Sequence, residues 1–203
     1  RFEAPCRSSP RWPPRFAPKW PSPGGRSPPT LRTLPAPLAG KNLNKGGVMK
    51  PRIEYVSVAP GAYRALSGLE VYLRQCGLEL RLLELVKLRA SQINGCAFCI
   101  DMHWKDARAA GEEEQRLYGL SAWEEAPYYT DRERAALLWT EAVTLVADGH
   151  VPDSVYDAVR PHFSDKELVD LSWAVAAINA WNRIAIALRS VPGSYQPPAR
   201  AKE

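Results

Sequence analysis

Two capping boxes constrain the fold more strongly than any other feature of this sequence. Thr130 and Ser164 are each followed three residues later by a glutamate, Glu133 and Glu167, and then by apolar residues at helical spacing. A Ser or Thr with Glu three residues on satisfies two backbone N–H groups that a helix start leaves unpaired. The sequence therefore predicts one helix from about Thr130 and a long one from about Ser164 through Leu188.

The rest of the chain after Met49 follows the same helical period, and no segment shows the two-residue alternation of a half-buried strand. Prolines at expected helix starts and glycines at expected stops divide this part of the chain. Further helices are predicted at 60–76, 79–93, 94–110, 112–119 and 152–160. The predicted fold class is all-α, a compact bundle of about six or seven helices.

Residues 1–48 differ in composition from everything after them. They hold 11 of the 19 prolines, nine of the 27 Lys and Arg residues and one of the 22 acidic residues. A cationic, proline-rich stretch without periodicity cannot bury enough apolar surface to fold, so a disordered tail is expected. An alternative is that 1–48 are an over-extended reading frame and that the natural protein begins at Met49. In either case the predicted helical domain spans 49–203.

The charge of the folded part excludes some classes of partner. Residues 49–203 keep 18 basic and 21 acidic residues, so the excess positive charge of the chain belongs to 1–48. This balance argues against nucleic-acid binding. No apolar run approaches the ~20 residues of a membrane span, and no signal peptide is recognisable, so we expect a cytoplasmic protein. Without a Gly-rich phosphate loop, no bound nucleotide or other cofactor is expected.

The chemistry of the chain is concentrated between Asn94 and His103. Cys96, Cys99 and His103 stand at i, i+3 and i+7, so on one helix they share a face. Asn94 is expected to cap that helix, which would put Cys96 in the first turn, where unpaired N–H groups favour a thiolate. His103 lies four residues after Cys99 and could accept its proton. Local physics therefore leaves open which sulfur attacks first.

Glu84 is a further candidate, because it lies on an apolar row of the preceding helix. Its neighbours at i±4 are Leu80 and Leu88, so its carboxylate should be partly desolvated, with a raised pKa suited to proton transfer. The alternative is a glutamate that reaches the surface or pairs with Lys87 or Arg81. The local pattern alone does not decide between these two.

Together these residues resemble a known family. Glu84, Cys96, Cys99 and His103 match the E-x11-C-x2-C-x3-H pattern of the AhpD-like alkylhydroperoxidases of the carboxymuconolactone decarboxylase superfamily. The resemblance covers 79–110 strongly and 120–141 and 180–192 more diffusely. It implies an all-helical subunit that self-associates. It also implies an antioxidant activity of the peroxiredoxin type, in which Cys99 attacks a hydroperoxide, Cys96 resolves, and Glu84 and His103 relay protons.

The resemblance also implies partners, and one residue departs from it. An external dithiol of the lipoyl or thioredoxin type would reduce the disulfide. The best-known relay of the family has a histidine just before the second cysteine, where this chain has Phe98, which cannot carry a proton. Two alternatives remain. One is a thiol-disulfide switch or interaction protein with little turnover; the other is a zinc site of the two thiolates, the imidazole and the carboxylate.

Overall fold

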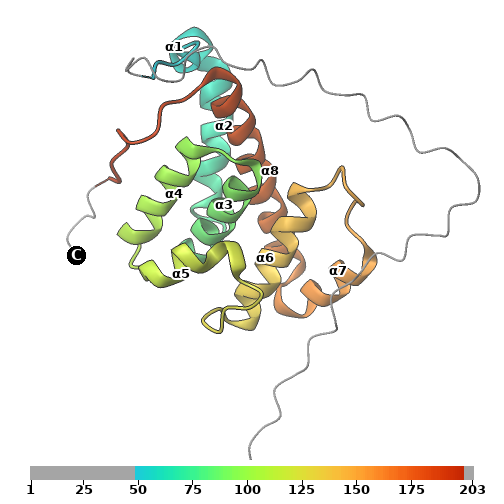
Figure 1. Ribbon diagram of the computed structural model, residues 1–203. Coiled ribbons are helices and arrows are strands. Elements are labelled where there is room, and N and C mark those ends of the chain that lie inside the picture. The colour runs from blue at the N-terminus through green and yellow to red at the C-terminus, as the bar shows by residue number, and fades with distance from the viewer. Residues whose placement is uncertain (1–48, 199–203) are drawn as a thin grey trace, which may run out of the picture. The chain divides into compact units, whose positions relative to one another are not determined.

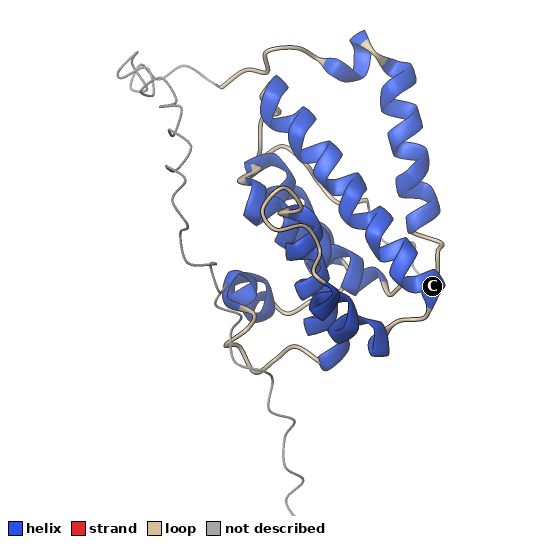
Figure 2. Cartoon of the chain, turned by 90° about the vertical axis from the view of Figure 1, so that its right-hand side faces the viewer, coloured by secondary structure: helices blue, strands red, loops and turns tan. Residues whose placement is uncertain are grey.

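The computed structural model of the protein describes residues 49–198, and its elements are helices. In chain order they are α1 (Tyr55–Val58), α2 (Pro60–Leu73), α3 (Leu80–Asn94), α4 (Ala97–Ala109), α5 (Glu114–Tyr118), the 3₁₀ helix η1 (Gly119–Ala122), α6 (Asp131–Thr144), α7 (Asp153–Val159), the 3₁₀ helix η2 (Arg160–His162) and α8 (Asp165–Leu188). No strand occurs between residues 49 and 198, as Figure 2 shows.

The all-α prediction is confirmed for this part of the chain. The predicted helices recur within a few residues, and the structure adds the short α1, whose four residues are too few to show a period. The expectations for residues 1–48 lie outside the described residues.

Both capping boxes form as predicted. The Thr130 hydroxyl accepts from the Glu133 backbone N–H at 3.3 Å, and the Glu133 carboxylate accepts from the Thr130 N–H at 2.7 Å. Ser164 and Glu167 make the same reciprocal pair at the start of α8. These local bonds fix where α6 and α8 begin.

Helix α3 is central, because it packs against α4, α6 and α8 (Figure 1). Nine of its residues are buried, including the charged Glu84 and Lys87. Three buried clusters surround it. One joins α2, α3, α6 and α8, a second joins α3 and α6 to the α5 region, and the third lies between α3, α4 and α8 and contains Cys96 and Cys99.

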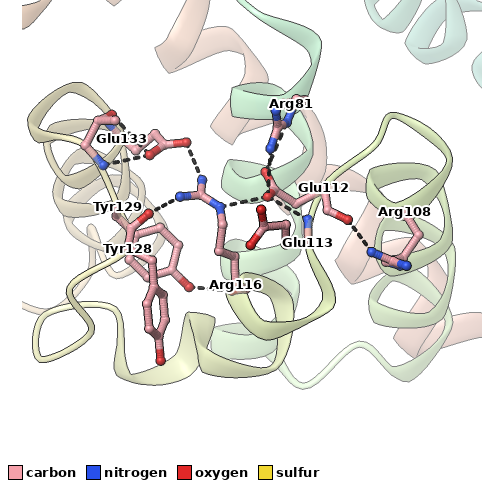
Figure 3. A network of polar contacts seen from close by, with 9 residues as sticks. Arg81, Arg108, Glu112, Glu113, Arg116, Tyr128, Tyr129 and Glu133 are labelled. Carbon is pink, nitrogen blue, oxygen red and sulfur yellow. Dashed lines mark hydrogen bonds and ion pairs between the residues drawn. The ribbon is translucent and has the colours of Figure 1, made fainter.

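A buried carboxylate fastens the α4–α5 corner to α3 and α6. Glu112 is fully buried, and its carboxylate accepts from Arg81 at 3.0 Å and from Arg116 at 2.7 Å. Figure 3 shows the Arg116 guanidinium between Glu112 and Glu133, which it also binds. Because α3, α5 and α6 each contribute one of these side chains, the network holds the elements around the site in register.

Helix α8 closes the bundle. It is the one described helix that is long and apolar enough to cross a membrane, judged by length and composition. However, it packs against α2, α3 and α6, and it buries the polar Asp170 and Asn182. These contacts are those of a core helix, and they bring α8 beside the cysteines.

Candidate functional site

The turn between α3 and α4 sets the position of the cysteine pair, and it differs from the prediction. Asn94 does not cap α4; it is the last residue of α3, and Gly95 ends that helix in the left-handed conformation with φ 70°. Cys96 occupies the N-cap position of α4. A glycine adopts this backbone readily, and the Asn94 amide instead binds across to α8. The helix therefore starts two residues later than predicted, and the expected first-turn position of Cys96 is wrong.

Both cysteines are free thiols and are buried, each with 1% of its surface exposed. They share a cluster with Ala90 of α3 and Ile178 and Ala185 of α8. Beside them lies a cavity of about 190 Å³. Its wall includes Cys96 but not Cys99, together with Phe98, Ala185, Ile186, Ser190 and Arg189, the one charged lining residue. Of the two cysteines, Cys96 is therefore the one that a small molecule in this cavity would contact.

The two thiols differ in acidity. Hydrogen bonding from the Cys99 thiol lowers the pKa of Cys96 to about 7 against the effect of burial, and the backbone N–H groups of Cys99 and Phe98 and the side chain of Asn182 add to this. Contact with Cys96, followed by burial, raises the pKa of Cys99. The backbone N–H groups of Phe98 and Cys99 lie in the first turn of α4, where a helix leaves its N–H groups unpaired. In the reduced pair the thiolate therefore belongs on Cys96 and the proton on Cys99.

Glu84 and His103 form a buried pair one helical turn from Cys99. Each is 5% exposed, and Nδ1 of His103 lies 2.7 Å from Oε2 of Glu84. Burial raises the pKa of Glu84, but hydrogen bonding and charge from His103, and charge from Lys87, outweigh it and leave that pKa below its ordinary value. The predicted raised pKa is therefore wrong: the carboxylate is ionised and can hold a protonated imidazole.

A second cavity reaches this pair from another side. It measures about 220 Å³ and is lined by Glu84 and Asp106, with Arg74 and Pro197 among its other residues. Burial raises the pKa of Asp106, whose carboxylate accepts a hydrogen bond from the Tyr195 hydroxyl at 2.6 Å. Cys96 and the two carboxylates thus line different cavities.

The predicted zinc set does not converge. Among residues 49–198, one group of three metal-ligand atoms lies within 4.8 Å, from Glu84, His103 and Asp106, and it includes neither sulfur. These three could hold a divalent cation. The alternative of a zinc ion bound by both thiolates, His103 and Glu84 is not supported by this geometry.

Sequence reasoning missed three neighbours of the site. Asn182 acts on both thiols from α8, and Tyr55 of α1 lies close enough for the thiols to raise its pKa, after burial as the larger cause. Both are distant from the pair in sequence, and no local pattern marks them. Asp106 had a signal, because it follows His103 by three residues and so shares its helix face.

Comparison with known proteins identifies the family. The sequence profile of the Carboxymuconolactone decarboxylase family (CMD) matches residues 59–142. A protein from Bacillus subtilis, the uncharacterised YdfG, is 45% identical over 140 residues, which cover 69% of this chain and 95% of that protein. This chain belongs to the carboxymuconolactone decarboxylase family.

Within the carboxymuconolactone decarboxylase family, solved structures support the AhpD-like resemblance. A protein of unknown function from Agrobacterium tumefaciens, described as a putative antioxidant defence protein AhpD, shares 48% identity. It has a TM-score of 0.70, and the match covers 72% of this chain and all of that one. The debrominase Bmp8 shares the fold at 18% identity, with a TM-score of 0.63 over 68% of this chain and 75% of its own. Proteins that share this fold thus include one named as an enzyme.

Proposed function

We propose that this protein is a thiol-dependent peroxidase that reduces hydroperoxides through a Cys96/Cys99 dithiol-disulfide cycle. One observation carries the proposal: a free, buried dithiol in which Cys96 occupies the N-cap position of α4 and forms part of a cavity wall. A thiolate is the nucleophile in peroxide reduction, and a nearby second thiol turns the oxidised sulfur into a disulfide.

The proposed reaction begins at Cys96, because it is the thiol with the lowered pKa and the one cysteine of the pair that lines the cavity. That sulfur attacks the outer oxygen of the hydroperoxide, the O–O bond breaks, and Cys96 becomes a sulfenic acid while the Cys99 thiol gives its proton to the leaving alkoxide. The resulting Cys99 thiolate attacks the sulfenic sulfur, closes the disulfide and expels hydroxide. Hydroxide takes a proton from His103 and leaves as water.

In this scheme Glu84 and His103 store the proton that Cys96 gives up on forming its thiolate. The ionised Glu84 stabilises the protonated imidazole until the ring returns that proton. The resemblance to the family assigns the attack to Cys99 instead, with Cys96 resolving. Both orders yield the same disulfide, and they differ in which sulfur is first oxidised.

The cavity supports a class of substrate. Apolar side chains such as Phe98 and Ile186 form much of its wall, with Arg189 and Ser190 among its polar residues. A small organic hydroperoxide fits this lining better than a purely polar peroxide. The reductant is proposed to be an external dithiol of the lipoyl or thioredoxin type. A homo-oligomer in the cytoplasm remains part of the proposal.

Steady-state peroxide consumption tests the function. Purified protein is supplied with an organic hydroperoxide and dihydrolipoate, and loss of the peroxide is followed for the wild type and for Cys96→Ser, Cys99→Ser and Cys76→Ser. We expect turnover in the wild type and in Cys76→Ser, whose changed thiol lies outside the pair, and at least 100-fold loss in the other two. Trapping of sulfenic acid in Cys99→Ser but not in Cys96→Ser would identify Cys96 as the attacking thiol. Wild-type consumption no faster than that of Cys96→Ser would favour a redox switch or interaction protein.

A further inference from the structure

One face of α8 covers the dithiol, and it carries a single amide. Ile178, Asn182 and Ala185 stand at i, i+4 and i+7, so they point the same way. Ile178 and Ala185 pack in one buried cluster with Cys96 and Cys99. Asn182, between them, is fully buried. A buried amide needs partners for its hydrogens, so the direction in which it donates has consequences for the sulfurs.

The hydrogen bonds of Asn182 fix the orientation of its amide. Its Oδ1 accepts from Nδ2 of Asn94 at 2.8 Å. Its Nδ2 lies 3.1 Å from Oγ of Ser91, and the Ser91 hydroxyl spends its one hydrogen on the Lys87 carbonyl at 2.7 Å. Ser91 can therefore only accept from Asn182, which must present its NH₂ group there. One hydrogen of that NH₂ group is used, and the second remains for another acceptor.

We propose that Asn182 is a catalytic residue whose second Nδ2 hydrogen is donated to the thiolate of the Cys96/Cys99 pair. The inference uses the dithiol of the proposed function but does not depend on a peroxide substrate. Hydrogen bonding from the Asn182 side chain lowers the pKa of both thiols. A donor held in place by Asn94 and Ser91 needs no reorganisation when charge arrives on the sulfur.

This role also bears on Phe98, which stands where the best-known relay of the family has a histidine. That side chain packs against the cysteine cluster and offers no proton or polar hydrogen. The polar donors to the sulfurs come instead from the start of α4 and from α8. The other titratable or charged groups near the pair are Tyr55 of α1, the Glu84–His103 pair of α3 and α4, and Arg189, which lines the cavity with Cys96. All of them are left unchanged in the test below.

The test is the pH dependence of alkylation at each cysteine, measured by mass spectrometry on the full chain with iodoacetamide. Asn182→Leu removes the donor at similar volume. Asn179→Leu is the matched control, since Asn179 accepts from the same Asn94 amide at 3.0 Å. Its own Nδ2 donates to Thr144 at 3.1 Å and to the Val175 carbonyl at 2.9 Å, so both of its amide hydrogens are used. We expect Asn182→Leu to raise the midpoint for Cys96 by about one pH unit and to slow labelling at pH 7 about fivefold. Asn179→Leu should keep the wild-type midpoint.

Equal midpoints in the wild type and Asn182→Leu would overturn the inference, as would equal upward shifts in both variants. If Asn182→Leu does not fold, the unmutated protein gives the answer by NMR. The Asn182 side-chain N–H signals should titrate with the Cys96 midpoint and stop doing so in Cys96→Ser. Signals that do not move with that midpoint would overturn the assignment. A wild type that consumes no peroxide yet shows these shifts would refute the proposed function alone.

Discussion

Burial of an ionised carboxylate such as that of Glu84 destabilises a fold unless a partner stabilises the charge. His103 does so here at 2.7 Å, with both side chains 5% exposed. The pair is therefore part of the stability of the protein as well as of its proposed proton relay. The two roles act at different pH. The proposed relay works near neutral pH, whereas the contribution to stability is lost only at acidic pH, when Glu84 becomes protonated.

Glu84→Gln should lower the free energy of unfolding by about 1–3 kcal/mol at pH 7. Because the pKa of Glu84 is lowered in the folded state, the stabilisation is fully present above the unfolded value of about 4.3. It is lost as the pH falls through the folded pKa. Denaturant unfolding from pH 7 down to pH 3 should show the difference from the wild type shrinking below about pH 4. A difference that stays constant over this range would contradict the ion pair.

At the scale of elements, the α3–α4 junction is where prediction from sequence failed. Asn94 is a good helix cap by type, but Gly95 is one residue later and is the one able to adopt φ 70°. A signal for a helix start and a signal for a helix end stand at adjacent residues here. Residue propensities do not tell which of the two decides where α4 begins. The boxes at Thr130 and Ser164 were predicted correctly, because their partners lie within one helical turn.

Gly95→Ala should destabilise the protein by about 1 kcal/mol, through backbone conformation and not through a clash. No atom lies within 4 Å of the position that a Cβ at Gly95 would take, but its φ is positive. Gly68→Ala is the matched control: this glycine has equally open surroundings inside α2 with ordinary helical φ, so the change should stabilise by about 0.5–1 kcal/mol. Thermal unfolding measures both. Equal effects of the two substitutions would refute the account of the junction.

The Glu112 network is a second feature at this scale. Its Glu112–Arg116 pair has the i,i+4 spacing of a local ion pair, but the contacts to Arg81 and Glu133 come from other elements and no spacing rule indicates them. Glu112→Gln leaves Arg81 and Arg116 without their shared carboxylate and should cost about 3 kcal/mol. The neighbouring Glu113→Gln changes an exposed side chain and should stay within about 0.5 kcal/mol. Urea unfolding of the two variants against the wild type gives both values. A near-neutral Glu112→Gln would show that the network adds little.

At the scale of the whole molecule, the sequence predicted the class of fold and the four candidate residues but not their arrangement. Cys96, Cys99 and His103 lie on or beside one helix, so spacing sufficed to group them. Glu84 reaches His103 because α3 packs on α4, a fact that spacing alone could not supply. Asn182 is 83 residues after Cys99 in the numbering and comes beside it only because α8 folds back across the bundle.

The proposed self-association also concerns the whole molecule. α8 exposes Val169 and Trp173, with 55% and 53% of their surfaces accessible, one turn apart. Exposed large apolar side chains on one helix face favour burial against another copy of the chain. Trp173→Glu should shift the protein to a smaller species in light scattering after size exclusion, whereas Tyr118→Glu, on the separate helix α5, should not. A wild type that is monomeric at all concentrations would contradict the proposed oligomer.

The dithiol-disulfide cycle is tested most directly by a single turnover without external reductant. Fully reduced protein is mixed with a limiting amount of organic hydroperoxide, and the thiols lost per peroxide consumed are counted and mapped by mass spectrometry. The proposed cycle predicts two thiols lost per peroxide and a disulfide joining Cys96 to Cys99. Peroxide that stays unreacted, or thiol loss confined to Cys76, would contradict it.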